Sequence, residues 1–178
     1  MIKTFYNEKI LSKNLALEIL KTLKNKNKLV LGCPGGRSLK KTYYYLGILS
    51  FKHKISLDRL TIVMMDEYVV KRNNKYFLVN PKSHFSCVRF SKNVIKKLLN
   101  YKKNKVNSLK ESNILFPSVT NPKKYDEIIK SLGGVDIFLL ASGSSDGHVA
   151  FNNIYSKVDQ NTHITKLPMS TRSDNMKT

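Results

Sequence analysis

A run of apolar residues that opens into a loop of small residues constrains this chain more than any other feature. It reads Val135-Asp-Ile-Phe-Leu-Leu-Ala141 and continues as Ser-Gly-Ser-Ser-Asp-Gly-His148. An apolar run of this length between turn residues is typical of a strand buried on both faces, as in a parallel sheet covered by helices. Such sheets bind ligands beyond the carboxyl ends of their strands. We therefore expect this loop to line a site, with Asp146 and His148 as candidate acid/base groups.

Amphipathic and apolar segments alternate along the rest of the chain. A stripe of Leu and Ile with Lys and Asn between them predicts a first helix, and the pattern then repeats. We expect helices over 8–26, 38–49, 83–90, 94–99 and 122–132, and strands over 29–33, 60–65, 113–117, 135–141 and, weakly, 163–167. Residues 71–82 are expected to form a polar connection. This order predicts an α/β fold with a mainly parallel sheet, built as a single domain over residues 1–178.

The charge of the chain suggests a polyanionic partner at first sight. The formal net charge is +20 and the pI is about 10.0. Most of the 32 basic residues are Lys, however, and Asn is also frequent. Proteins that read nucleic acids favour Arg, which contacts bases and phosphates through two hydrogen bonds. We therefore expect a solvated basic surface and no nucleic acid as the main partner.

The cysteines and the hydropathy pattern bear on the compartment. Cys33 and Cys87 have neither a disulfide pattern nor the spacing of metal ligands, which indicates a reducing compartment and two inert buried thiols. The N-terminal residues turn polar too early for a signal peptide, and no apolar run approaches the ~20 residues of a membrane span. These observations predict a cytoplasmic protein.

Two further strand ends carry candidate functional residues. Gly32-Cys-Pro-Gly-Gly-Arg-Ser38 joins a strand to a helix that Ser38 could cap, and a glycine turn before a helix N-terminus suits an anion such as phosphate. An ordinary strand-to-helix turn explains it equally well. Met65-Asp-Glu-Tyr68 places two carboxylates at the next strand end. Because adjacent strand residues point to opposite faces, only one of Asp66 and Glu67 can face a given site.

The first loop also matches the pattern G-x-S-x-G of a hydrolase nucleophile elbow. Gly143-Ser-Ser-Asp-Gly147 would make Ser145 the nucleophile. Its partners would have to be Asp159 and His163, which lie too close together in the sequence to come from separate strand ends. A short motif of this kind matches by chance, so we do not favour this interpretation.

Taken in order, five segments of the chain resemble the glucosamine-6-phosphate deaminase family. The two most specific are M-D-E-Y-V and D-G-H-V-A-F-N, and their occurrence together in this order carries more weight than either alone. The segments are Leu31–Ser38, Met65–Val69, Asn80–His84, Val135–Asn152 and Ser170–Asn175. The related 6-phosphogluconolactonases share the D-G-H core but typically have G-D-E-R in place of M-D-E-Y.

The resemblance implies a fold, a reaction and a set of site residues. The fold is a Rossmann-like three-layer sandwich, and the reaction converts glucosamine 6-phosphate and water to fructose 6-phosphate and ammonia without a metal or organic cofactor. Asp66 would move a proton between C2 and C1 of the sugar. His148, supported by Asp146, would assist ring opening. Phosphate would be held by the glycine loop (Gly35, Gly36, Arg37 and Ser38) and by Arg172.

The chain also departs from the family pattern. Asn153 occupies the place of a glutamate that helps ring opening, and an amide cannot relay a proton as a carboxylate does. Arg37 stands where a small residue is usual. Family members continue some tens of residues further, so we expect a sheet that exposes an apolar edge, which favours a homo-oligomer or an unstable remnant. A lactonase, another sugar-phosphate enzyme and a degenerate sugar-phosphate binder therefore stay open as alternatives.

Overall fold

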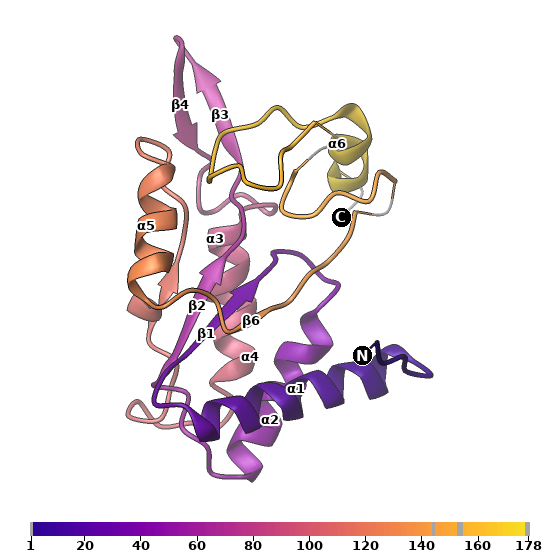
Figure 1. Ribbon diagram of the computed structural model, residues 1–178, viewed down its shortest axis with the longest axis vertical. Helices are drawn as coiled ribbons and strands as arrows, with labels where there is room; N and C mark the ends of the chain where they lie inside the picture. The colour runs from indigo at the N-terminus through magenta and orange to yellow at the C-terminus, as the bar shows by residue number, and fades with distance from the viewer. Residues whose placement is uncertain (1, 144, 153–154, 177–178) are drawn as a thin grey trace.

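The computed structural model of the chain describes residues 2–143, 145–152 and 155–176 (Figure 1). The separate α-helices are α1 (Glu8–Asn25), α2 (Lys40–Lys52), α5 (Lys123–Ser131) and α6 (Met169–Met176). A continuous helical run consists of α3 (Cys87–Phe90), the π-helical turn η1 (Ser91–Ile95) and α4 (Lys96–Leu99), and a 3-10 turn, η2, covers Glu111–Asn113. The strands are β1 (Leu29–Cys33), β2 (Leu60–Met64), β3 (Val69–Arg72), β4 (Lys75–Leu78), β5 (Ile114–Leu115) and β6 (Ile137–Phe138).

The main sheet is parallel and has the order β5-β2-β1-β6. β1 and β2 pair along their whole lengths, from Leu29 opposite Leu60 to Cys33 opposite Met64. The chain builds outward from β1 through β2 to β5 and then returns to place β6 on the other side of β1. This reversal of strand order beside β1 is the point at which open α/β sheets bind ligands, beyond the carboxyl ends of the strands.

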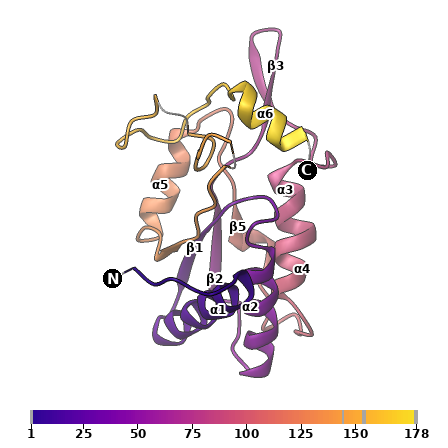
Figure 2. The same cartoon turned by 90° about the vertical axis from the view of Figure 1, so that its right-hand side faces the viewer.

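Helices cover both faces of this sheet (Figure 2). On one face, alternate side chains of the central strands, such as Leu31 and Ile62, join a large core with α1, α2 and the helical run 87–99. On the other face, Val30 and Val63 pack against Tyr125 of α5. The Tyr125 hydroxyl donates to the carbonyls of Met64 (2.8 Å) and Leu115 (3.0 Å), which fixes α5 over two strands. The predicted α/β fold with its three layers is confirmed.

The polar connection expected over 71–82 is in fact part of a β-hairpin. β3 and β4 pair antiparallel, from Val69 opposite Leu78 to Arg72 opposite Lys75. Asn73 and Asn74 form the two-residue turn with φ of 46° and 60°. Left-handed residues at both central positions match the twist of the flanking strands, and Asn tolerates this conformation well. The hairpin projects from the carboxyl-end side of the sheet (Figure 1).

Three local predictions are corrected by the structure. Only Ile137–Phe138 of the apolar run pairs in the sheet, and it does so at the edge, so the run is not buried on both faces: Phe138 is 46% exposed and Leu140 is 60% exposed. Residues 163–167 form no strand, since the chain there runs irregularly into α6. Ser38 does not cap α2. The helix begins at Lys40 with Leu39 as its N-cap and without a side-chain capping bond, because residues 37–40 first form a turn.

Candidate active site

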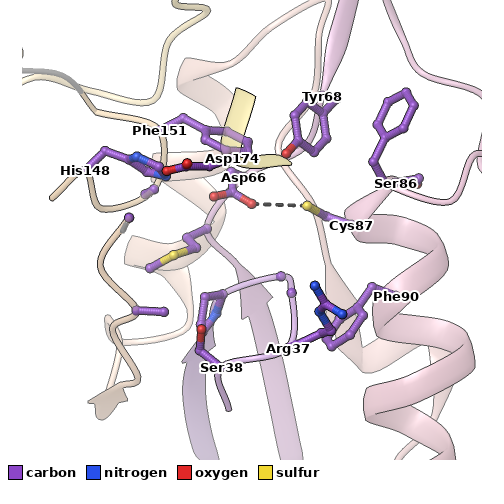
Figure 3. A pocket seen from close by; sticks show the side chains of 18 of the residues that line it. Arg37, Ser38, Asp66, Tyr68, Ser86, Cys87, Phe90, His148, Phe151 and Asp174 are labelled. Carbon is purple, nitrogen blue, oxygen red and sulfur yellow. Dashed lines mark hydrogen bonds between the residues drawn. The ribbon is translucent and has the colours of Figure 1, made fainter. Parts of the chain in front are cut away.

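A cavity of about 420 Å³ opens beyond the carboxyl ends of β1, β2 and β6 (Figure 3). The loop after β1 contributes residues 34–38, and the end of β2 contributes Met65, Asp66 and Tyr68. Residues 84–87 and Phe90 form the wall at the start of α3. Residues 141–143, His148, Ala150 and Phe151 come from the loop after β6, and Asp174 comes from α6. The three strand-end motifs of the sequence thus meet in one cavity.

Asp66 lies on the cavity side of the end of β2, where it is half-buried. Its Oδ1 atom lies 3.2 Å from the Sγ atom of Cys87, which donates a hydrogen bond to it. Desolvation by burial raises the pKa of Asp66 to about 6, a shift that the Cys87 hydrogen bond and the nearby His148 oppose and Glu67 reinforces. A carboxylate with a pKa in this range can both accept and return a proton near neutral pH.

Glu67 points away from the cavity and holds the start of α3. Its carboxylate accepts hydrogen bonds from the backbone N–H groups of Tyr68 (2.7 Å), Cys87 (3.0 Å) and Val88 (2.7 Å) and from the Ser86 hydroxyl (2.9 Å). It therefore satisfies free N–H groups at a helix start, where negative charge is favourable. Of the two adjacent carboxylates, Asp66 faces the cavity and Glu67 positions the helix that forms its wall.

His148 and Asp146 form a hydrogen-bonded pair in the loop after β6. The Nδ1 atom of His148 lies 2.5 Å from Oδ1 of Asp146. The other carboxylate oxygen, Oδ2, accepts hydrogen bonds from Ser170 (2.8 Å) and from the buried Thr171 (2.6 Å) of α6. The hydroxyl of Thr171, followed by His148 and Ser170, lowers the pKa of Asp146 well below its usual range. Asp146 thus stays ionised and can hold a proton on Nδ1 of His148.

The backbone of this loop is tightly constrained around the pair. A Cβ atom at Gly143 would lie 2.2 Å from Nδ1 of His148, so only glycine lets the chain pass there. Ala150 and Phe151 adopt left-handed φ values of 53° and 57° in a turn closed by the bridge between Val149 and Asn152. Strain of this kind is typical of functional loops. The turn presents the ring of Phe151 to Tyr68 (4.8 Å between centroids) and to His148 (5.8 Å).

The glycine loop after β1 forms the side of the cavity opposite the pair. Gly35 lies against Cys87, where a Cβ atom would meet the Sγ atom at 2.8 Å, and Gly36 adopts a φ of 84°. Arg37 and Ser38 are exposed and line the cavity (Figure 3). The loop leads directly into α2, so backbone N–H groups and one guanidinium lie close to the opening. This combination of groups favours an anion.

Two other predicted residues lie elsewhere. Arg172 is exposed on α6 and is not part of the cavity lining, so its role in binding phosphate stays a prediction. Ser145 also lies outside the lining. Its hydroxyl donates to Asp174 at 2.6–2.7 Å, and this geometry does not support a nucleophile elbow. Asn153, at the position of the family glutamate, lies outside the described residues.

The sequence did not point to three residues that the fold brings to the site. Cys87 contacts Asp66, Thr171 supports Asp146, and Asp174 lines the cavity beside them (Figure 3). Thr171 and Asp174 belong to the S-T-R-S-D-N segment that the family resemblance marks, so the sequence indicated the segment but not these two residues. Cys87 had none, because an isolated Cys at a helix start is usually an inert core residue.

In the described part of the chain, no group of three or more His, Cys, Asp or Glu residues is placed to hold a metal ion. None of the helices described is both long and apolar enough to cross a membrane.

The sequence and the fold were compared with known proteins. No protein-family model matches the sequence. Glucosamine-6-phosphate deaminase from Clostridium tetani is 30% identical over 180 residues, which cover 98% of this chain and 67% of that protein. The deaminase from Mycoplasma mycoides subsp. mycoides is 31% identical over 171 residues, which cover 93% of this chain and 62% of that protein. The chain thus spans about two thirds of the length of these curated relatives.

Two solved structures share the fold. A monomeric glucosamine-6-phosphate deaminase superimposes with a TM-score of 0.80 and 24% identity, over 96% of this chain and 66% of that one. The 6-phosphogluconolactonase from Thermotoga maritima gives a TM-score of 0.59 and 21% identity, over 85% of this chain and 62% of that one. The chain therefore shares the fold of these two proteins, and its family follows from the sequence relatives. The chain belongs to the glucosamine-6-phosphate deaminase family.

Proposed function

We propose that this chain catalyses the deamination of glucosamine 6-phosphate, in which the sugar phosphate and water give fructose 6-phosphate and ammonia. The observation that carries this proposal is the placement of two acid/base groups around one cavity. Asp66, with a pKa raised to about 6, faces the cavity from β2, and His148, held by Asp146, faces it from the loop after β6. The two carboxylates also differ, because the pKa of Asp66 is raised and that of Asp146 is lowered. Titratable groups whose pKa values are pushed apart in this way are typical of sites with divided acid/base roles.

Asp66 suits the proton transfer between C2 and C1. It would remove the C2 proton from the open-chain sugar and return it to C1, while the aldehyde oxygen takes up a proton that the amino group gives up. C1 thereby becomes an alcohol carbon and C2 an imine carbon. Water then adds to that carbon, and ammonia leaves as the ketose carbonyl forms. A carboxylate with an ordinary pKa is a weaker base. Partial burial raises the pKa of Asp66 and so makes its carboxylate a stronger base.

His148 suits the ring-opening step that must come first. Opening the pyranose moves a proton from the anomeric hydroxyl to the ring oxygen. Because Nδ1 is engaged by Asp146 at 2.5 Å, Nε2 is the ring nitrogen that would exchange this proton with the sugar. The hydroxyls of Ser170 and Thr171 orient Asp146, and through it the imidazole.

The phosphate group would lie at the glycine loop. Residues Gly35 to Ser38 offer backbone N–H groups and the guanidinium of Arg37, on the side of the cavity away from His148. Arg172 would join them only if its exposed side chain turned toward the cavity. We further propose that residues 1–178 act as one domain in the cytoplasm, which the two buried free thiols of Cys33 and Cys87 support.

Ammonia release from glucosamine 6-phosphate by the purified chain tests the proposal. We expect release by the unmodified protein and a loss of at least ~100-fold in Asp66→Asn, since general-base catalysis contributes about 10²–10⁴-fold. Asp159→Asn is the matched control, because Asp159 is an exposed carboxylate outside the cavity lining and its loss should leave the rate unchanged. No release, or release that survives Asp66→Asn, would contradict the proposal.

A lactonase activity is the second candidate. The fold likeness to the Thermotoga 6-phosphogluconolactonase and the Asn at position 153 favour it. It predicts hydrolysis of 6-phosphogluconolactone without ammonia release from the amino sugar. Both substrates should therefore be assayed on the same protein preparation.

A further inference from the structure

The thiol of Cys87 lies directly against the carboxylate of Asp66. The distance from Sγ to Oδ1 is 3.2 Å, within the range of a sulfur hydrogen bond, and the side chains come from different elements, α3 and the end of β2 (Figure 3). Cys87 is only 5% exposed, yet it lines the cavity. A buried thiol that contacts a carboxylate inside the site is more than a filler of apolar space.

Two neighbouring features hold the thiol in this place. Glu67 accepts hydrogen bonds from the backbone N–H groups of Cys87 (3.0 Å) and Val88 (2.7 Å) and from the Ser86 hydroxyl (2.9 Å), so the start of α3 is tied to the residue that follows Asp66. On the other side, Gly35 leaves room for the Sγ atom, which a Cβ atom there would meet at 2.8 Å. Cys87 is thereby hydrogen-bonded to two adjacent residues at the end of β2, through its thiol to Asp66 and through its backbone N–H to Glu67.

We propose that Cys87 is a positioning residue of the site, whose thiol donates a hydrogen bond to Oδ1 of Asp66 and holds the carboxylate toward the cavity. The bond favours the ionised form of Asp66, the form that accepts a proton. The role of this geometry in catalysis rests on the function proposed above, whereas the contact itself does not.

Several groups act on the pKa of Asp66 together with the thiol of Cys87. Burial raises the pKa of Asp66 to about 6, and the Cys87 hydrogen bond is the largest influence that lowers it. Glu67 raises this pKa and His148 lowers it, while Arg37 and Asp174 line the same cavity. In return, burial and then the charge of Asp66 raise the pKa of the Cys87 thiol well above its ordinary value. The two groups should therefore titrate as a coupled pair.

Alkylation of the thiol tests the contact without any assay of activity. Iodoacetamide is the probe, and peptide mass spectrometry separates Cys87 from Cys33, which is fully buried and serves as the internal reference. In Asp66→Asn we expect Cys87 to react roughly 10-fold faster at pH 8, because each pH unit by which a thiol pKa falls toward the ambient pH raises its thiolate fraction about 10-fold. Asp159→Asn should leave the rate unchanged. An equal rate at Cys87 in unmodified protein and in Asp66→Asn would overturn the proposal.

The pH dependence of kcat/KM tests the consequence for the reaction. Loss of the donor in Cys87→Ala should move the acid limb about half to one pH unit toward neutral, since an uncompensated carboxylate is harder to ionise. Cys87→Ser keeps a donor of similar size and should return the limb to its original place. A residue that only fills space would lower stability in Cys87→Ala without moving the limb.

The outcomes separate this proposal from the assignment of function. An acid limb that stays in place in Cys87→Ala, or moves equally in Cys87→Ser, would overturn the positioning role. If the unmodified protein releases no ammonia, the deaminase assignment fails, and the alkylation result alone decides whether the thiol is bound to Asp66. If Cys87→Ala does not fold, the alkylation of Asp66→Asn still decides, because it needs no change at Cys87.

Discussion

Asp66 destabilises the folded chain at neutral pH because its carboxylate is ionised in a half-buried position, where its contact with water is reduced. Burial raises its pKa to about 6 in the fold, against an ordinary value near 4 in an unfolded chain. A carboxyl group whose pKa is raised by folding favours the fold while it is protonated. This contribution is fully present below about pH 4 and is lost as the pH rises through about 6. A site that needs a strong base thus weakens the fold that carries it.

Replacement of Asp66 by Asn should therefore stabilise the protein above pH 6. At about 1.4 kcal/mol per pH unit of pKa difference, the gain in unfolding free energy is up to roughly 3 kcal/mol at pH 7.5, and it should vanish near pH 4. The amide oxygen can still accept the Cys87 hydrogen bond, so little packing is lost. Urea unfolding of both proteins between pH 4.5 and 8 measures the difference.

Asp159→Asn provides the comparison for this stability change. Asp159 is exposed, so its replacement should shift the unfolding midpoint equally at every pH, and by little. A stability difference between Asp66→Asn and the unmodified protein that does not grow from pH 4.5 to 7.5 would contradict the burial of an ionised Asp66.

At this scale the sequence pointed to residues that the fold places in or beside one cavity, but not to the residues that support them. Asp66, Asp146, His148 and the residues of the glycine loop could be named because each lies at a strand end, and strand ends of a parallel sheet meet at one edge. Cys87 could not, because its approach to Asp66 depends on how α3 packs beside β2. Arg172 shows the reverse case, since a motif marked it for the site while the backbone leaves its side chain exposed.

The loop after β6 and helix α6 are held together by two reciprocal sets of hydrogen bonds. Asp146 of the loop accepts from Ser170 and Thr171 of the helix, and Asp174 of the helix accepts from the backbone and hydroxyl of Ser145 in the loop. Each element thus supplies both a carboxylate and its donors. Because His148 is oriented by Asp146, the helix sets the position of the imidazole through these bonds.

Thr171→Val should disturb this arrangement with almost no change of side-chain shape. Thr171 is fully buried, and its hydroxyl lies 2.6 Å from Asp146. Without it, Asp146 keeps Ser170 and His148 as donors but loses the largest influence that lowers its pKa. We expect kcat/KM to fall between roughly 10- and 100-fold, the cost of a misplaced catalytic group. Ammonia release, with nitrogen NMR of His148 to follow the ring, measures the effect.

Ser173→Ala is the control on the same helix, because Ser173 is exposed and lies outside the cavity lining. Its activity should match that of the unmodified protein. Equal activity in Thr171→Val would show instead that the hydroxyl only fills space beneath the loop.

Elements with long apolar runs were predictable, and elements set by turns were not. β1 and β2 follow continuous apolar segments, and α1 and α5 follow their amphipathic stripes to within a residue or two. The β3–β4 hairpin was missed because its strands mix apolar residues with Lys, Arg and Tyr. Val69 and Val70 of β3 are only half-buried and β4 is exposed, so no core pattern marks the strands. α6 was missed because it is short and polar, and it depends on the hydrogen bonds to the loop.

Two properties of the whole molecule oppose each other in solution. The net charge of +20 makes copies of the chain repel one another over a distance set by the salt concentration. The outer edge of β6 has the contrary effect, because β6 pairs only with β1 among the described strands and leaves Phe138 and Leu140 exposed at 46% and 60%. An apolar sheet edge of this kind promotes association between chains.

We therefore expect self-association of the chain to grow with salt concentration. Raising the salt from about 0.05 M to about 1 M shortens the screening length from well above 10 Å to about 3 Å, which removes the repulsion but leaves the apolar attraction. Leu140→Lys should abolish the association, and the effect should depend on protein concentration. Sedimentation velocity over a range of both concentrations measures it.

Tyr6→Lys separates the edge from surface hydrophobicity in general. Tyr6 is another exposed large side chain, at 95%, but it lies beside the N-terminus and away from β6, and the substitution adds the same charge. If β6 is the contact, Leu140→Lys remains monomeric at high salt while Tyr6→Lys associates as the unmodified chain does. Equal loss of association in both variants would place the cause in the net charge alone. In that case the exposed edge of β6 would not be a contact between copies of the chain.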